Sequence, residues 1–250
     1  MEISAFFSAH PKVALAFSGG VDSAYLLYLA VQSGADVHAY YVKSAFQPQF
    51  ELEDAKKLAE QLHAKMTVIA ADVLSNATIA ANPSDRCYHC KKIIFSAIAH
   101  HALADGYQTL LDGTNASDDA GDRPGMRALQ ELQVLSPLRL CGYPKDEIRR
   151  KSKEAGLFTW NKPAYACLAT RISTGDALTQ EKLMQTEQAE DALRALGFSD
   201  FRVRMIGNAA KIELPASQFE KMFACRTAVL QTLKKYYKTV LLDLEARNGL

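Results

Sequence analysis

The stretch VALAFSGGVDSAYLLYLAVQ, residues 13–32, decides the fold. Its apolar beginning, Val13–Phe17, predicts a buried β-strand, and Ala24–Gln32 predicts a mostly apolar helix that closes at Gly34. Between them lies Ser18-Gly19-Gly20-Val21-Asp22-Ser23, where the strand turns into the helix. The two glycines let backbone N–H groups approach a polyphosphate, the two serine hydroxyls add donors, and the helix N-terminus adds partial positive charge. The sequence therefore predicts a phosphate-binding loop.

This loop lacks two common phosphate-binding patterns. The chain has no GxxxxGK[ST] sequence, which excludes a Walker-type NTPase, and no full G-x-G-x-x-G, which weakens a dinucleotide interpretation. Asp22 is placed to organise the loop or to hold a Mg²⁺ ion that bridges phosphates. The alternative is an ordinary glycine-containing turn between a strand and a helix.

The first half of the chain continues as alternating strands and helices. Further strands are expected at 37–42, 66–70 and 107–111, with a short fifth at 133–135, and helices at 51–63 and 88–104. Strands separated by helices imply a parallel α/β sheet with right-handed crossovers and helices on both faces.

The tail of the chain has a different rhythm. It predicts a helix at 179–196 with a Thr cap, a hairpin of 201–205 and 210–214 around Gly207-Asn208, a helix at 217–236 and a strand at 239–242. We expect a first domain over residues 1–170 and a small C-terminal α+β domain over 177–250, separated by an irregular stretch.

The composition bounds the class of protein. The chain has 250 residues, of which 48% are hydrophobic and 23% charged, and 29 basic against 28 acidic residues leave a net charge of +1. This balance argues against a protein that coats nucleic acid or an anionic membrane. The sequence has no apolar run long enough for a membrane span and no secretion signal, so we expect a cytoplasmic protein. Five cysteines, an odd number, argue against a disulfide framework.

Three of the cysteines are candidates for chemistry. Cys87 and Cys90 form a C-x-x-C at the start of a helix, and Cys167 lies in a small-residue segment followed by Arg171. A redox pair, half of a zinc site, or structural cysteines are the alternatives for the C-x-x-C, and a zinc ion held by the three cysteines with His89 as fourth ligand is the alternative to a cluster. Three thiolates are one fewer than a closed zinc or iron–sulfur site needs, so a [4Fe–4S] cluster on them would keep one iron open for a hydrosulfide. Cys141 and Cys225, the latter within a helix, are interpreted as structural.

Polar residues elsewhere point to anionic ligands. Arg202 and Arg204 are two residues apart in a predicted strand, so they share one face and both can reach the same phosphate. Glu213 on the paired strand is placed to orient one of them. Asp112-Gly113 and Arg123-Pro124-Gly125 follow the fourth strand, at the sheet edge where α/β proteins bind ligands. Asp118 and Asp119 are either magnesium ligands or a solvated acidic loop, and Lys91, Lys92 and Arg171 are candidates for neutralising phosphates or a cluster.

These motifs together resemble a known family. SGGVDS is similar to the PP-loop of the N-type ATP pyrophosphatases, which cleave ATP between the α and β phosphates and transfer AMP to an oxygen. SGGVDS, RCYHCK, LDGTNASDD, WNKPAYACLATR and FRVRMIGNAAKIELP occur in the order found in the LarE family, over roughly residues 10–245. The resemblance implies a PP-loop fold of the adenine nucleotide alpha hydrolase type. It also implies an ATP-dependent sulfur transferase of nickel-pincer cofactor assembly, which acts on pyridinium-3,5-biscarboxylic acid mononucleotide.

The resemblance also implies roles for residues. Cys87, Cys90 and Cys167 match the members that hold a [4Fe–4S] cluster, whereas other members sacrifice the sulfur of the cysteine that matches Cys167. The implied catalytic residues are Cys167, Asp22 and Glu190, and the implied substrate-phosphate site is Arg202, Arg204 and Glu213. The implied ATP site with Mg²⁺ comprises Ser18, Gly19, Gly20, Val21, Asp22, Ser23, Asp112, Gly113 and Arg171.

Partners and rival functions complete these expectations. The family implies a homo-oligomer, an external sulfur donor and a downstream nickel-inserting protein, with no nucleic acid or membrane partner. The rivals are a tRNA thiolation enzyme, an amidase or synthetase of the same fold, and a nucleotide-binding regulatory module that never cleaves ATP.

Overall fold

The computed structural model describes residues 1–118 and 124–247, which form two compact units. The first unit comprises Met1–Val73 and Asp85–Lys162, and the second comprises Leu74–Ser84 and Pro163–Leu250. The second unit thus includes a short segment from the first half of the chain. The expected division into independent domains, 1–170 and 177–250, stays a prediction. Within the described part of the chain, no helix has the length and apolar character needed to cross a membrane.

A four-stranded parallel sheet organises the first unit. Its strands are β1 (Lys12–Ala16), β2 (Asp36–Lys43), β3 (Lys65–Ala70) and β4 (Thr109–Leu111), in the order β3-β2-β1-β4. The prediction of a parallel sheet is confirmed. The expected fifth strand at 133–135 was too long, because the structure has only a single bridge between Leu111 and Leu135 there.

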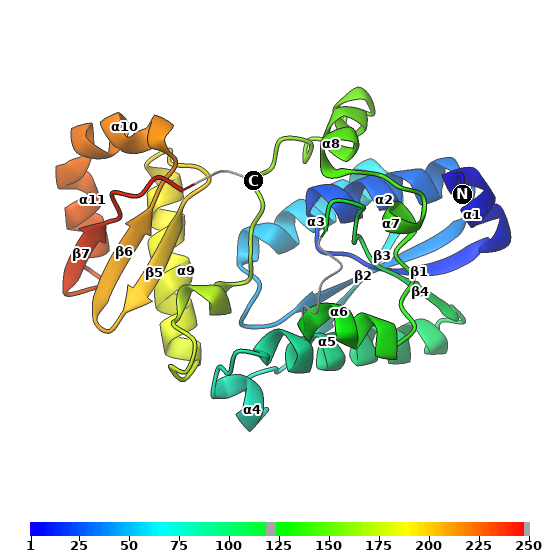
Figure 1. The fold of residues 1–250 in the computed structure, drawn as a ribbon, viewed down its shortest axis with the longest axis horizontal. Helices are drawn as coiled ribbons and strands as arrows, with labels where there is room; N and C mark the ends of the chain where they lie inside the picture. Colours follow the sequence, from blue (N-terminus) through cyan, green and yellow to red (C-terminus); the bar gives the residue numbers. More distant parts are fainter. Residues whose placement is uncertain (119–123, 248–250) are drawn as a thin grey trace. The chain divides into compact units, whose positions relative to one another are not determined.

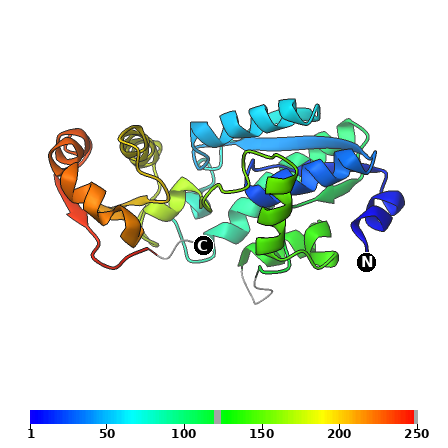
Figure 2. The same cartoon turned by 90° about the horizontal axis from the view of Figure 1, so that it is seen from above.

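Helices cover both faces of this sheet. The helices of the unit are α1 (Ile3–Ala9), α2 (Val21–Gln32), α3 (Gln49–Gln61), α5 (Arg86–Ala104), α6 (Pro124–Glu131), α7 (Pro137–Leu140) and α8 (Lys145–Glu154). Figures 1 and 2 show α2, α3 and α8 over one face and α5 with α6 over the other. Alternate strand residues serve the two sides: Leu15 and Tyr41 pack into the core under α2 and α3, whereas Ala14 and Tyr40 pack toward α5. The inner strands β1 and β2 are therefore buried on both faces, as parallel strands usually are.

The sequence patterns did not predict the helices of the first unit other than α2, α3 and α5. The reason is clearest for α8, on which the buried positions are only Ile148 and Ser152. A helix with one buried apolar side chain has no periodic apolar stripe to reveal it.

The second unit holds a separate three-stranded sheet. Its strands are β5 (Arg202–Ile206), β6 (Ala209–Glu213) and β7 (Thr239–Leu242), and its helices are α4 (Ala77–Ala80), η1 (Leu168–Arg171), α9 (Gln180–Ala195), η2 (Ala216–Gln218), α10 (Phe219–Ala224) and α11 (Arg226–Leu233). β5 and β6 form the expected antiparallel hairpin, and β7 joins β6 in parallel. The Thr179 side chain accepts a hydrogen bond from the Lys182 backbone N–H, which confirms the expected cap of α9.

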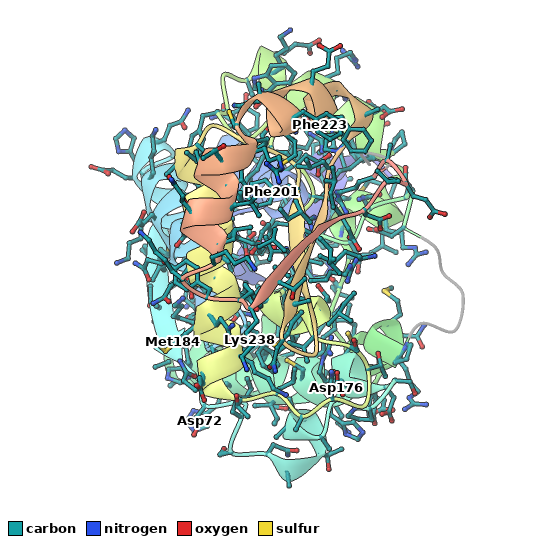
Figure 3. All side chains as sticks on the ribbon, turned by 90° about the vertical axis from the view of Figure 1, so that its left-hand side faces the viewer. Asp72, Asp176, Met184, Phe201, Phe223 and Lys238 are labelled. Atoms are coloured by element: carbon teal, nitrogen blue, oxygen red, sulfur yellow. The ribbon has the colours of Figure 1, made fainter. Side chains whose placement is uncertain are left out.

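The expectation of one helix over 217–236 was wrong. A short 3-10 helix, η2, comes first, and the α-helical part is then interrupted at Cys225, which lies at φ −92° and ψ 7° between α10 and α11. Cys225 is therefore a junction residue and not part of a continuous helix. On α10, Phe223 keeps 61% of its surface exposed, and Figure 3 shows it at the outer side of the second unit.

Candidate active site

The predicted phosphate loop lies between β1 and α2 and is held by its own serines. The Ser18 and Ser23 hydroxyl oxygens are 3.1 Å apart, and the Gly20 backbone N–H donates to Ser18 Oγ at 3.3 Å. Ser23 Oγ in turn donates to the Gly20 carbonyl at 3.2 Å. Because the serines fix the turn, the backbone N–H groups at the start of α2 are presented together, which is the arrangement that binds phosphate.

Two glycines allow close approaches around this loop. Gly19 has φ +70°, and a Cβ there would lie 3.0 Å from the Cβ of Ala55 on α3. Gly113, after β4, packs against the loop so closely that a Cβ would lie 2.9 Å from the Ser23 backbone nitrogen. Backbone at Gly113 therefore supports the loop from the neighbouring strand, which only a residue without a side chain permits.

Asp22 has one carboxylate oxygen in an ion pair and the other unpaired. Its Oδ2 lies 2.6 Å from the ammonium of Lys145, at the start of α8. Its Oδ1 is buried and has no hydrogen-bond partner among the described residues. A buried, unpaired carboxylate oxygen is costly unless something binds it. Asp22 therefore fits the role of a ligand for a hard cation such as Mg²⁺.

Asp112 orders the loop after β4. Its carboxylate accepts hydrogen bonds from the hydroxyls of Thr114 at 2.5 Å and Ser136 at 2.6 Å, and it is 6% exposed. Since both oxygens are engaged, Asp112 acts on the site by holding Gly113 in place beside Ser23.

A cavity of about 150 Å³ lies beside the phosphate loop. Its lining combines the end of β1, the end of β2, the start of α3 and one face of α5, with Phe17, Ser18, Tyr40, Tyr41, Val42, Gln47, Glu51, Ile94, Phe95 and Ile98 among its residues. Mostly apolar walls with a few polar groups suit a flat aromatic base. The cavity has no motif in the sequence, although the spacing of Ile94, Phe95 and Ile98 places apolar residues on one face of α5.

Two lysines near the loop were also missed. Lys145 pairs with Asp22, and Lys162 Nζ lies 2.8 Å from Asp54 Oδ2 and 3.4 Å from the Gly19 carbonyl. Both come from segments far along the chain from the loop, so no local motif could have indicated them.

In the second unit, Cys167 immediately precedes η1, and Arg171 ends it. Arg171 and Glu190 form a buried ion pair, with Arg171 Nε 2.7 Å from Glu190 Oε1 and both side chains 1% exposed. Glu190 also accepts hydrogen bonds from the Tyr165 hydroxyl at 2.5 Å and from the Val203 backbone N–H at 3.0 Å. The Glu190 carboxylate on α9 thus contacts β5 and one residue on each side of Cys167 in the chain.

The charges in this buried network shift the arginine pKa values. Burial acts to lower the pKa of Arg171, but the Glu190 carboxylate outweighs it and raises that pKa, with Cys167 adding to the effect. Burial, together with the positive charges of Arg171 and Arg247, lowers the pKa of Arg202 to about 10. Arg171 is therefore a fixed cation next to Cys167.

The two hairpin arginines differ in their surroundings. Arg202 is 4% exposed and donates to the backbone carbonyls of Phe201 and Ala164, whereas Arg204 has a 39% exposed side chain. Arg204 donates to Glu213 Oε1 and to the Thr170 carbonyl, each at 2.6 Å. The orienting contact expected for Glu213 is therefore present. The prediction that both guanidiniums bind one phosphate stays a prediction.

Several of the remaining candidate residues lie at the start of α5, which spans Arg86–Ala104. Cys87 is exposed and Cys90 half-buried, and as residues three apart on a helix they share a face.

The charged candidate residues have partners of their own. Lys92 Nζ lies 3.0 Å from Glu131 Oε2, and the Lys91 side chain runs beside Gly125. His89 contacts Asp85 at 3.2 Å, and Asp118 Oδ2 accepts from the Asn115 backbone N–H at 2.9 Å. Asp119 and Arg123 lie outside the described residues.

The three candidate cluster ligands belong to different units. Cys87 and Cys90 lie in the first unit and Cys167 in the second. Among the residues that the structure describes, no three His, Cys, Asp or Glu side chains are grouped so that they could hold a metal ion. Three thiols remain the right donor type for an iron–sulfur cluster.

Comparisons with known proteins match both the phosphate-loop segment and nearly the whole chain. A family model described as the queuosine biosynthesis protein QueC matches residues 12–86, which include the phosphate loop. An uncharacterised protein of Synechocystis is 35% identical over 96% of this chain and 91% of its own. A pyridinium-3,5-bisthiocarboxylic acid mononucleotide synthase of Lactiplantibacillus plantarum is 34% identical over 93% of this chain and 86% of its own.

A more distant similarity is to enzymes that thiolate tRNA. A tRNA-specific 2-thiouridylase of Clostridium botulinum is 29% identical over 60% of this chain and 52% of its own. The similarity to the synthase, by contrast, extends over nearly the whole of both chains. The protein therefore belongs to the LarE family, the family of this synthase, and is an ATP-using sulfur transferase of the PP-loop type.

Proposed function

We propose that the protein adenylates a carboxylate of pyridinium-3,5-biscarboxylic acid mononucleotide and replaces the AMP with sulfur. The observation that carries this proposal is the near full-length similarity to a synthase named for the bisthiocarboxylic product. The serine-held phosphate loop supports it, because adenylation requires that the pyrophosphate of ATP be bound and released.

The first chemical step forms a mixed anhydride. A carboxylate oxygen of the substrate attacks the α-phosphorus of ATP, and the bond between that phosphorus and the oxygen leading to the β-phosphorus breaks. The electron pair leaves with pyrophosphate, whose growing charge falls on the N–H groups of the loop and the N-terminus of α2. The substrate then carries AMP, which is a far better leaving group than oxide.

Around this step, first-unit residues bind the rest of the nucleotide. The unpaired Oδ1 of Asp22 would hold Mg²⁺, which neutralises phosphate charge when it is bound. The apolar cavity lined by Phe17, Tyr40 and Phe95 would take the adenine base. Asp112 keeps Gly113 against the loop, so the site is shaped before the nucleotide arrives.

The second step replaces AMP with sulfur. A sulfur nucleophile attacks the carbonyl carbon, the bond from carbon to the AMP oxygen breaks, and AMP leaves; repetition on the second carboxylate gives the bisthiocarboxylic acid. Cys87, Cys90 and Cys167 would hold a [4Fe–4S] cluster, which would keep one iron open for a hydrosulfide. The alternative is that the Cys167 thiolate is the nucleophile and forms a thioester as AMP leaves. Its Cα then loses a proton, its Cβ–S bond breaks with the electron pair going to the thiocarboxylate of the substrate, and dehydroalanine remains.

The second unit would bind the phosphate of the substrate. Arg204 has a side chain that is 39% exposed, and Glu213 holds its guanidinium in one orientation. Arg202 would support the site from behind, through its bonds to backbone carbonyls. Glu190 would position Cys167 by anchoring Tyr165 and Arg171 on either side of it.

Pyrophosphate release from ATP is the direct test. We expect release that requires the pyridinium substrate and that is coupled to formation of AMP. Release stimulated by tRNA instead would favour the thiolation alternative, and ATP binding without cleavage under every condition would favour a regulatory module. Either result would contradict the proposal.

Further properties rest on the family resemblance. Assembly as a homo-oligomer, an external sulfur donor, a downstream nickel-inserting partner and a cytoplasmic location stay predictions. Size-exclusion chromatography with light scattering tests the first of these directly.

A further inference from the structure

The phosphate loop has no basic residue of its own. Residues 18–23 contain two glycines, two serines, one valine and the acidic Asp22. When pyrophosphate leaves, several negative charges collect on this loop, and backbone N–H groups with one Mg²⁺ would have to balance them next to a carboxylate. A neighbouring cation would reduce that repulsion.

The structure places such a cation there from a distant segment. Lys145 is the first residue of α8, and its ammonium lies 2.6 Å from Asp22 Oδ2 across a separation of 123 residues in the chain. The start of α8 is fixed by a hydrogen bond from the Lys145 backbone N–H to Ser117 Oγ at 2.9 Å. Ile148, one turn later, is completely buried in the core that α8 shares with α2. The lysine is thus held at the loop by the fold.

The ion pair is also open to a ligand. The Lys145 side chain is 30% exposed and the Asp22 side chain 23% exposed. A partly exposed ion pair of this kind contributes little to the free energy of unfolding. Stabilising the contact between α8 and α2 is therefore a weak explanation for the pair. The compact ammonium of a lysine can turn from a carboxylate to a phosphate with small changes of its flexible stem.

We propose that Lys145 is the phosphate-binding lysine of this loop, contacting the β- and γ-phosphates of ATP and the pyrophosphate that leaves. In the proposed adenylation, on which this inference rests, the bond from the α-phosphorus to the bridging oxygen breaks and the electron pair goes to pyrophosphate. The ammonium of Lys145 stabilises that charge without transferring a proton. Lys145 thus supplies from α8 what a Walker loop carries within its own sequence.

Equilibrium binding of pyrophosphate and of AMP, measured by calorimetry on the full chain, tests this. We expect Lys145→Met to weaken pyrophosphate binding by about tenfold to a hundredfold, because one charged hydrogen bond is lost, and to leave AMP binding within about twofold. Lys151→Met is the matched control, since Lys151 lies on the same helix in an ion pair with Glu147 at 2.9 Å. It should change neither affinity, and thermal melting of both variants checks the fold.

A second background separates direct binding from positioning of Asp22. If Lys145 only positions Asp22, then adding Lys145→Met to Asp22→Asn has no further effect on pyrophosphate binding in EDTA. We expect a further loss of about tenfold. Wild-type protein that binds no pyrophosphate, or a Lys145→Met variant with unchanged affinity, would overturn the inference.

These binding measurements do not depend on turnover. If the wild type never releases pyrophosphate but Lys145→Met still loses pyrophosphate affinity, the proposed function fails and the inference about Lys145 stands.

Discussion

At the scale of single residues, Glu190 connects several segments of the second unit through its carboxylate. Its carboxylate forms a buried ion pair with the Arg171 guanidinium, and it also accepts hydrogen bonds from the Tyr165 hydroxyl and the Val203 backbone N–H. The ion pair and the contact with Val203 are buried, so the attraction between the two charges must offset the free-energy cost of removing them from water, which requires good geometry.

Replacing Glu190 should therefore unfold the protein more easily. We expect Glu190→Gln to lower the free energy of unfolding by about 3–5 kcal/mol, because it leaves the Arg171 charge buried without a counterion. Urea denaturation followed by circular dichroism measures this. Glu181→Gln, an exposed position in the first turn of the same helix, is the control and should stay near wild type. Equal stabilities for the two variants would contradict this account of Glu190.

Glu213 predicts a dependence of stability on pH. Burial acts to raise its pKa, but hydrogen bonds from Arg204 and Lys211 outweigh this, and the pKa lies below its ordinary value of 4.5. A carboxylate with a depressed folded pKa stabilises the protein above its unfolded pKa and loses that contribution as the pH falls through the folded pKa.

The measurement compares the wild type with Glu213→Gln. The stability difference between them should be constant near neutral pH and should shrink as the pH falls below about 4.5, where the unfolded carboxylate protonates. Urea denaturation at pH values from about 3 to 7 tests this. A difference that grows toward acid would show that Glu213 is not stabilised as a carboxylate.

At the scale of elements, the segment after β4 packs against the phosphate loop so closely that it leaves no space for a side chain at Gly113. Gly113 has no room for a side chain because the Ser23 backbone nitrogen is so close, and backbone cannot move away as a flexible side chain can. The geometry of the loop therefore depends on a residue on the neighbouring strand.

Gly113→Ala should displace the start of α2. We expect ATP affinity to fall by about tenfold or more, since misplaced N–H groups lose charged hydrogen bonds to phosphate. Equilibrium ATP binding measures this. Gly125→Ala on α6 is the comparison variant, because the nearest atoms that an added Cβ meets there belong to the flexible side chain of Lys91, at 3.2 Å. Unchanged affinity in Gly113→Ala would show that the loop tolerates the displacement.

Element prediction from sequence succeeded where the chain carried a periodic pattern or a cap. The strands β1–β3, helices α2, α3, α5 and α9, and the β5–β6 hairpin follow from apolar spacing, a Thr cap and a glycine turn. The division between α10 and α11 does not, because the apolar spacing continues through Cys225. Among the candidate site residues, Ser18–Ser23 and Glu213 stand out in the local sequence pattern, whereas Lys145 and Lys162 do not.

At the scale of the whole molecule, the three candidate cluster cysteines come from two units. A shared cluster would make iron content a property of both units together. Each cysteine would then be equally necessary, because loss of one of three thiolate ligands leaves the cluster without a stable anchor.

Iron and sulfide content after anaerobic purification tests this. We expect about four irons per chain in the wild type and little in Cys87→Ala, Cys90→Ala or Cys167→Ala. Cys225→Ala, a half-buried cysteine at the junction of α10 and α11, is the control and should keep its iron. An iron-free wild type that turns over once and loses the sulfur of Cys167 would establish the sacrificial route instead.

The sequence by itself determined the strand, loop and helix of the candidate phosphate site, the parallel sheet, and the hairpin that carries Arg204. These depend on turns, caps and apolar periods that act between residues a few positions apart. Only the tertiary structure decided that Lys145 meets Asp22, that Glu190 joins Tyr165 to Arg171, and that residues 74–84 belong with the second unit. These contacts join side chains from distant segments, and burial and charge pairing in the folded core select them without leaving a local pattern in the chain.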